Sequence, residues 1–123
     1  MAKPLRLILI ADDDEDIRSS LRDLFNGAGY AVDTAEDGQQ ALDHLRTQKR
    51  PDLIVLDLRM PQKSGQEVLD ALRHSTTLMA IPVVVLSAYL DFPPPGAVAW
   101  LKKPVAPSLL LGTVENYLGG VRR

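Results

Sequence analysis

The amino-acid sequence predicts an α/β fold, in which a parallel sheet carries helices on both of its faces. Short apolar runs rich in branched side chains recur along the chain, and their length and composition are typical of buried parallel strands. Segments in which apolar residues return with the period of a helix lie between these runs. Strands that alternate with helices are joined by right-handed crossovers, so the strands run parallel and the helices cover both sides of the sheet.

The first half of the chain is expected to form three strands and two helices. The strands are expected at 5–11, 30–34 and 52–57. The first helix begins at the acidic residues 14–16, which are favourable at the positive end of a helix dipole, and it stops at Gly27. The second helix follows Asp37-Gly38. The inward-facing residues of the two helices are Ile17, Leu21, Leu24 and Phe25 in the first and Ala41, Leu42 and Leu45 in the second.

The second half is expected to contain two more strands, at 81–86 and 97–101, and two more helices. Val68, Leu69 and Leu72 share one face of the helix that precedes the strand at 81–86. The last helix is expected over 107–118, because Pro suits the first helical position and the pair Gly119-Gly120 suits the end.

Composition limits the fold to one domain and the function to a few classes. A chain of 123 residues with 46% apolar and 24% charged residues is expected to form a single domain over 1–123, with an ordered core at about 5–118. The net charge of −2 and the scattered basic residues argue against direct binding of nucleic acid. The absence of cysteine and of any run long enough to span a membrane predicts a cytoplasmic protein without membrane insertion.

Three aspartates stand where two of the predicted strands leave the core. Asp12 and Asp13 close the first strand, and Asp57 closes the third. Ligands of open α/β sheets bind outside the carboxyl ends of strands, where the strand order reverses. Carboxylates about 4 Å apart repel by roughly 4 kcal/mol per pair at an effective dielectric constant of about 20, so three of them recruit positive charge. The pattern predicts a divalent-cation site, and Mg²⁺ suits hard oxygen ligands best.

The acidic run 12–16 also has a simpler interpretation, as the solvated start of a helix. We favour that interpretation for residues 14–16. It fits Asp12 and Asp13 poorly, because they follow the strand directly and lie opposite a second strand that ends in aspartate.

Four short motifs resemble, in order, the signatures of the response-regulator receiver domain of two-component signalling. They are Ile10-Ala11-Asp12-Asp13, Leu56-Asp57-Leu58-Arg59-Met60-Pro61, Leu86-Ser87-Ala88 and Leu101-Lys102-Lys103-Pro104. Together these motifs are highly specific, and the resemblance extends over nearly the whole chain. It implies a flavodoxin-like fold, a doubly wound five-stranded parallel sheet with the strand order 2-1-3-4-5.

The resemblance also implies the chemistry of the acidic site. Asp57 would accept a phosphoryl group, and Mg²⁺ would be bound by Asp13, Asp57 and the backbone carbonyl of Arg59, with Asp12 reaching the metal through water. An aspartate that attacks phosphorus needs no general base, because it is already ionised at pH 7. It needs neutralisation of the charge on the transferred oxygens, which the metal and a lysine supply.

Further residues would respond to the phosphoryl group. The resemblance implies that Ser87 contacts the group and is drawn inward as a switch, and that Lys103 pairs with it. Lys103 is chosen over its solvated neighbour Lys102 because it precedes Pro104, and the corresponding bond in the family is commonly cis. Trp100 stands where the family usually has a switching Tyr or Phe, and is either a lid over a missing helix or part of the core.

The connection between the fourth and fifth strands departs from the family. Only fifteen residues separate Ser87 from Lys103, and receivers usually have about six more, the room that a helix needs. The prolines at 93–95 exclude an ordinary helix, because each lacks an amide donor and restricts its predecessor. The helix between these strands is therefore expected to be missing or reduced, and the usual receiver dimer face cannot be carried over.

These observations favour a stand-alone receiver. It would accept phosphate from a histidine kinase or histidine phosphotransfer protein and change its binding to an unidentified downstream protein, catalysing only its own phosphorylation and hydrolysis. A degenerate receiver that binds partners without phosphorylation is the alternative. A small Mg²⁺-dependent phosphohydrolase is a third, but it would need an acid where Arg59 stands. His44 and His74 are expected at the surface, outside any phosphorelay.

Overall fold

The computed structural model describes residues 5–60, 64–88 and 94–118, which form five strands and four helices. The strands are β1 (Leu7–Ala11), β2 (Ala31–Ala35), β3 (Leu53–Asp57), β4 (Val83–Ser87) and β5 (Ala99–Lys102). The helices are α1 (Glu15–Gly27), α2 (Gly38–Thr47), α3 (Gly65–Arg73) and α4 (Pro107–Tyr117). The predicted doubly wound α/β fold is confirmed.

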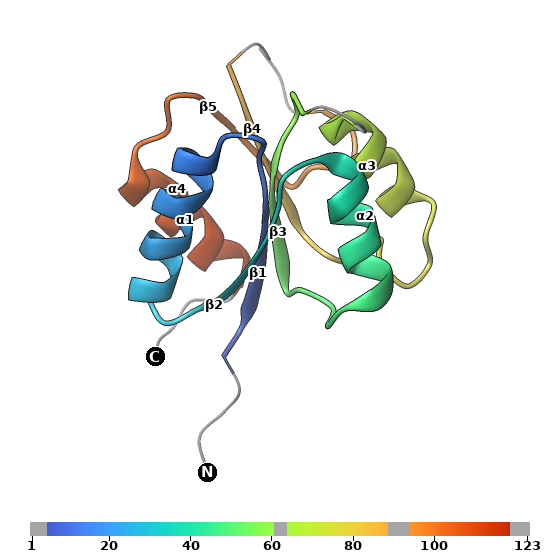
Figure 1. The fold of residues 1–123 in the computed structure, drawn as a ribbon, viewed down its shortest axis with the longest axis horizontal. Helices are drawn as coiled ribbons and strands as arrows, with labels where there is room; N and C mark the ends of the chain where they lie inside the picture. The colour runs from blue at the N-terminus through green and yellow to red at the C-terminus, as the bar shows by residue number, and fades with distance from the viewer. Residues whose placement is uncertain (1–4, 61–63, 89–93, 119–123) are drawn as a thin grey trace.

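All five strands are parallel, and their order in the sheet is β2-β1-β3-β4-β5 (Figure 1). The chain moves outward from β1 to β2 and then returns to the other side of β1 to form β3. The strand order therefore reverses between β1 and β3. Ligand sites of open α/β sheets lie at the carboxyl ends of two such strands.

Helices cover the sheet from both sides, with α1 and α4 on one face and α2 and α3 on the other (Figure 1). Side chains of β1 alternate between the two cores: Ile8 and Ile10 pack on the α1 and α4 side, while Leu9 and Ala11 pack on the α2 and α3 side. The central strands are buried on both faces, which explains why their sequences are continuous apolar runs.

Capping residues fix where the helices begin. Asp14 accepts hydrogen bonds from the amides of Asp16 and Ile17 at the start of α1, as the interpretation of residues 14–16 as a helix start requires. Asp37 caps α2, and Ser64 forms a capping box with Glu67 at α3.

Predicted and observed strand boundaries differ by one or two residues. Leu5 lies outside the sheet and is 58% exposed, so β1 begins at Leu7. The fifth strand was expected at 97–101 and lies at 99–102, because Ala97 belongs to the turn before it. The bond between Lys103 and Pro104 is cis, as the family resemblance implies.

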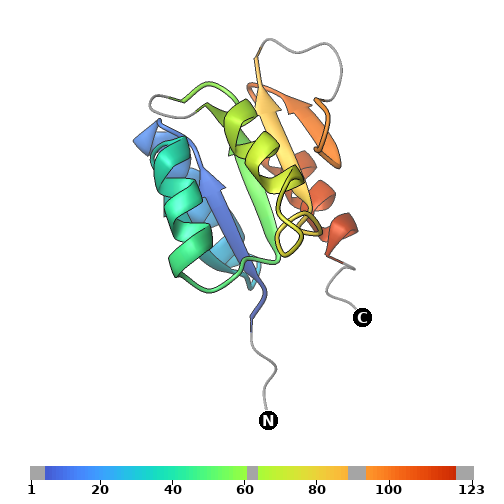
Figure 2. The same ribbon diagram turned by 90° about the vertical axis from the view of Figure 1, so that its right-hand side faces the viewer.

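No helix is present in the described residues between β4 and β5, namely 88 and 94–98. This agrees with the expected loss of that helix at Pro94 and Pro95; Pro93 lies outside the described residues. Figure 2 shows α2 and α3 lying over the sheet while no helix in the described part of the chain covers β5 on that side. Trp100 of β5 packs against the core on this same side. No helix in the described ranges is long and apolar enough to cross a membrane.

Candidate metal centre

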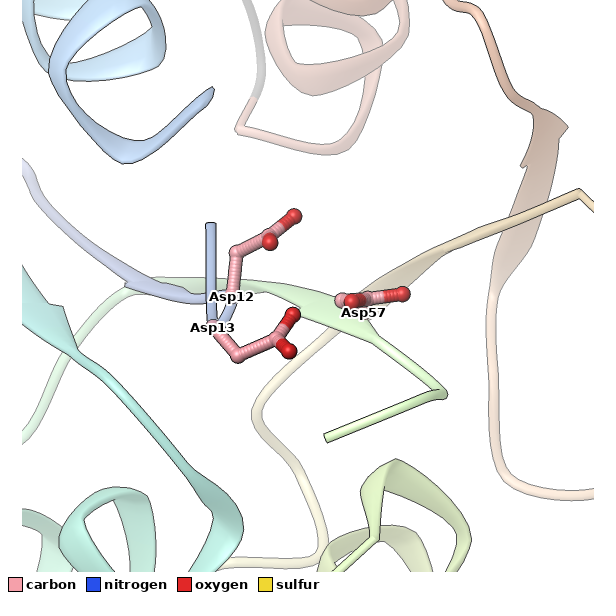
Figure 3. Close-up of side chains that lie close together, drawn as sticks. All are labelled: Asp12, Asp13 and Asp57. Carbon is pink, nitrogen blue, oxygen red and sulfur yellow. The ribbon is translucent and has the colours of Figure 1, made fainter. Parts of the chain in front are cut away.

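Asp12, Asp13 and Asp57 come together at the point where the strand order reverses. Asp12 and Asp13 follow the last residue of β1, and Asp57 is the last residue of β3. The side chains of the first two point from the end of β1 toward that of Asp57 (Figure 3). One carboxylate oxygen from each residue lies within 4.8 Å of the others. Asp12 and Asp57 are buried, whereas Asp13 is exposed.

Each polar group of Asp12 has a partner. Its amide donates to the carbonyl oxygen of Ala35 (3.2 Å), and its carboxylate accepts from the amide of Asp14 (2.9 Å) and from Nζ of Lys103 (3.0 Å). The guanidinium Nη1 of Arg18 donates to its carbonyl oxygen (2.8 Å). Asp12 is therefore fixed at its main chain and at its side chain.

Asp57 is held less tightly and carries an unfavourable charge. Its Oδ1 accepts a 3.3 Å hydrogen bond from the amide of Arg59 and lies 3.6 Å from Nζ of Lys103. Burial raises the pKa of Asp57, and the negative charges of Asp12 and Asp13 raise it further. The charge of Lys103 and the Arg59 amide act in the opposite direction without cancelling the increase. The ionised site is thus short of positive charge.

Lys103 is the cation that faces the carboxylates. Burial by itself lowers the pKa of Lys103, but the hydrogen bond to Asp12 and the charges of Asp12 and Asp57 leave that pKa above its ordinary value. The amide of Lys103 donates to the carbonyl oxygen of Ser87 (3.0 Å), which fixes the main chain where Lys103 leaves β5. Lys102 is exposed, as expected.

Ser87 lies on β4, next to the strand that ends in Asp57, and Trp100 lies on β5, one strand further away. Ser87 ends β4 and is buried. Because side chains alternate along a strand, Ser87 points to the same face as Val85, and Val85 lies opposite Trp100 in β5. Trp100 is half-buried, and its indole Nε1 is buried without a hydrogen-bond partner in the described structure. The two residues thus share one face of the sheet.

The donors of this site suit a hard divalent cation. A hollow of about 320 Å³ is lined by four aspartates, the three above and Asp14, together with Ile17, Arg59, Ala88 and Lys103. Every charged ligand atom is a carboxylate oxygen, and neither sulfur nor imidazole lines the hollow. Such a donor set is typical of Mg²⁺, which keeps waters in its remaining positions. Arg59 lines the hollow as well, so its backbone carbonyl remains the predicted third direct protein ligand, beside Asp13 and Asp57.

One residue of the site was missed from the sequence, and one histidine was misjudged. Arg18 was not selected, although it is buried and contacts Asp12; its position three residues before Leu21 and seven before Phe25, on the apolar face of α1, was the available signal. The expectation that His44 is a surface residue was wrong. Its side chain is only 14% exposed, and its Nε2 lies 2.9 Å from Oδ2 of Asp33. His74 is exposed, as expected.

Comparison with known proteins identifies close relatives of this architecture. The family model of the response regulator receiver domain matches residues 8–115. The polar-differentiation response regulator DivK of Brucella anthropi is 32% identical over 118 residues, which cover 91% of this chain and 95% of that protein. The chemotaxis protein CheY4 of Vibrio cholerae is similar in structure, with a TM-score of 0.83 and 31% identity over 93% of this chain and 99% of that one. A putative response regulator from Chloroflexus aurantiacus has a TM-score of 0.86 at 29% identity, over 94% and 99% of the two chains.

Proposed function

The chain belongs to the response-regulator receiver family of two-component signalling, and from this premise we propose that it is a switch controlled by phosphorylation of Asp57. The phosphoryl donor is a histidine kinase or a histidine phosphotransfer protein. The output is altered binding of a downstream protein. We also propose that residues 1–123 form one receiver domain, of which the family model matches 8–115.

The arrangement around Asp57 carries the proposal. Asp57 is a buried carboxylate with Lys103 on one side and the acidic pair Asp12 and Asp13 on the other. One of its oxygens attacks phosphorus, so an O–P bond forms while the P–N bond of a phosphohistidine or the P–O bond of acetyl phosphate breaks. The leaving group takes the electron pair of the broken bond. No proton has to be removed from Asp57, because the attacking group is the carboxylate.

Mg²⁺, held by Asp13, Asp57 and the carbonyl of Arg59, with Asp12 reaching it through water, would supply positive charge for the transferred oxygens. Lys103 lies 3.6 Å from Asp57, and its ammonium supplies a second positive charge at the reacting atom. The three carboxylates balance one lysine and one divalent cation. Phosphorylation adds about one negative charge, since a phosphoryl group carries roughly −2 at pH 7 and replaces a carboxylate charge.

The added charge requires a response from the neighbouring strands. Ser87 ends the strand next to Asp57, and its hydroxyl is a donor suited to the new oxygens. Lys103 is tied to Ser87 through the main chain, so a shift of either residue is transmitted to β5 and Trp100. We propose that this movement changes the surface beside β5.

Intact-mass spectrometry with acetyl phosphate and Mg²⁺ tests the acceptor. We expect the wild-type chain to gain the mass of one phosphoryl group and Asp57→Asn to gain none. Labelling should disappear when Mg²⁺ is chelated. The exposed Asp14→Asn serves as the matched control, because it removes a carboxylate from the edge of the same hollow and should keep the label. Equal labelling of Asp57→Asn would remove Asp57 from this role.

A degenerate receiver, which binds its partner without phosphorylation, is the second candidate. The observation in its favour is the reduced connection between β4 and β5, where receivers have a helix and where residues 94–97 form a turn. The two candidates differ in one measurement. Retention of the same partners by Asp57→Asn and by the labelled wild-type chain would support the degenerate receiver.

A further inference from the structure

Arg18 is the one buried polar residue in the described structure whose role the proposed function leaves open. The others are Asp12, Asp57 and Ser87, which all belong to the site. Arg18 lies in the first half of α1 and is 8% exposed. A buried charge is costly unless it is paired or fully hydrogen-bonded, so its presence calls for a reason.

The surroundings of Arg18 do not supply the usual reason. Its guanidinium forms no salt bridge with a described residue, and its side-chain hydrogen bond goes to a neutral group, the carbonyl oxygen of Asp12. A cation near the start of a helix also opposes the helix dipole. Burial, the lack of a carboxylate partner and the position in α1 are all unfavourable. The contact that the described structure offers in return is the hydrogen bond to Asp12.

The hydrogen bond from Arg18 to the Asp12 carbonyl matters most for the next residue, Asp13. The carboxylate of Asp12 is held by Lys103 and by the amide of Asp14. The carboxylate of Asp13 is exposed and has no hydrogen bond or ion pair to a described residue. The direction of Asp13 is therefore set by its main chain. The carbonyl of Asp12 belongs to the peptide plane that leads into Asp13, and Arg18 fixes that plane by holding its oxygen.

We propose that Arg18 is a positioning residue for the metal centre, which fixes the peptide between Asp12 and Asp13 so that Asp13 is aimed at Asp57. This inference rests on the proposed function, since it assumes that Asp13 binds Mg²⁺ directly. For the loss of Arg18, the proposal predicts a change in Mg²⁺ affinity opposite to the change that charge alone predicts. On charge alone, removing the arginine that contacts Asp12 should strengthen Mg²⁺ binding, whereas loosening the Asp12 carbonyl should weaken it.

Calorimetric Mg²⁺ titration of the chain without phosphodonor tests the proposal. We expect Arg18→Met to weaken Mg²⁺ binding by about tenfold, the effect typical of residues that support a metal ligand. Arg18→Lys should recover part of the affinity, because an ammonium can still donate to the carbonyl. The control is Arg22→Met, one turn further along α1, where an exposed arginine without a bond to the site is removed. Its Mg²⁺ affinity should stay within twofold of wild type.

The outcomes separate this proposal from the proposed function. No Mg²⁺ binding by the wild-type chain would contradict the proposed function itself. Wild-type binding together with unchanged or tighter binding by folded Arg18→Met would overturn the role of Arg18 alone. If Arg18→Met does not fold, NMR spectroscopy of the wild-type chain provides a second test. We expect the guanidinium protons of Arg18 to exchange more slowly than those of Arg22 and to shift during the titration; equal exchange without a shift overturns the proposal.

Discussion

The ends of β1 and β3 and the ends of β4 and β5 form two halves of one site, and they are built differently. We call the first, with Asp12, Asp13 and Asp57, the acidic half, and the second, from Ser87 to Lys103, the response half. In the acidic half every polar group of Asp12 is held by a partner. In the response half the helix expected in a receiver is absent from the described residues, and Trp100 has a buried indole nitrogen without a described partner.

Under the proposed function, this difference separates chemistry from output. Phosphoryl transfer requires carboxylates fixed to within a fraction of an ångström, so the acidic half follows the family motif closely. Recognition of a partner depends on the surface that a particular chain presents. The response half therefore departs from the family where the connection between β4 and β5 is shortened, and we expect partner choice to differ there.

The largest expected effect lies in the acidic half and concerns Mg²⁺. Asp13→Ala should weaken Mg²⁺ binding by about 100-fold and Asp12→Ala by about 10-fold, because direct coordination contributes more than a contact through water. Asp14→Ala removes the same charge from an exposed residue beside both and should change the affinity only a few-fold. Equal effects of the three variants in calorimetric titration would mean that charge alone, without defined ligands, attracts the ion.

Replacing one glycine in each half by alanine compares the rigidity of the two halves. A Cβ on Gly65 would lie 2.4 Å from the carbonyl oxygen of Asp57 and 2.6 Å from Cα of Leu58, so Gly65→Ala must move the backbone of the acidic half. We expect a loss of about 2 to 3 kcal/mol in the free energy of unfolding.

Gly96, in the response half, has a positive φ of 95°, and a Cβ there would meet only the flexible side chain of Arg73 at 2.7 Å. Gly96→Ala should cost about 1 kcal/mol. Gly112→Ala, which meets no atom within 4 Å, is the control and should stabilise the helix slightly. Denaturant unfolding measures all three. A larger loss at Gly96 than at Gly65 would reverse the comparison.

The pH dependence of stability tests the charge shortage of the acidic half. Because burial and Asp12 raise the pKa of Asp57, the folded chain binds its proton at a higher pH than the unfolded chain does. Without metal, stability should therefore fall as the pH rises from the unfolded pKa of about 3.8 through the folded pKa of Asp57. Asp57→Asn should lack this decrease and be more stable than wild type at pH 7.

Denaturant titrations across this pH range, in the presence of a chelator, provide the measurement. Asp23→Asn, an exposed residue of α1, is the control for removing one carboxylate. Identical pH profiles for wild type and Asp57→Asn would show that Asp57 carries no such strain. Saturating Mg²⁺ should abolish the decrease in the stability of the wild type with rising pH, because the ion supplies the missing positive charge.

The smallest expected effect is spectroscopic and lies in the response half. Trp100 is the sole tryptophan of the chain, and it shares a sheet face with Ser87. If Ser87 moves toward the phosphoryl group, close packing requires Trp100 to adjust. Addition of Mg²⁺ with beryllofluoride should shift the tryptophan emission of the wild type; Ser87→Ala should reduce the shift, and Asp57→Asn should abolish it. Constant emission at full occupancy of Asp57 would make Trp100 a static part of the core.

Much of the fold followed from the sequence, because its signals are local. The apolar runs of β1, β3 and β4 are buried on both faces, which leaves no polar residue to obscure them. The sequence alone predicts that Asp12, Asp13 and Asp57 lie close together, because parallel strands have their carboxyl ends at one edge of the sheet. The prolines at 94 and 95 likewise exclude an ordinary helix, because the effect of proline on the backbone is local.

Other features depended on which distant segments meet. The ion pair between Lys103 and Asp12 joins residues that are 91 positions apart, and only packing shows that Lys103 lies closer to Asp12 than to Asp57. The same holds for His44, which reads as a surface residue until β2 brings Asp33 beside it. The position of Arg18 on the apolar face of α1 can be read from the sequence, but its partner, the Asp12 carbonyl, is set only when α1 docks. Periodicity shows which face of an element is buried, but the partner of a polar group is decided by tertiary contacts, because charge and hydrogen bonding act across space and not along the chain.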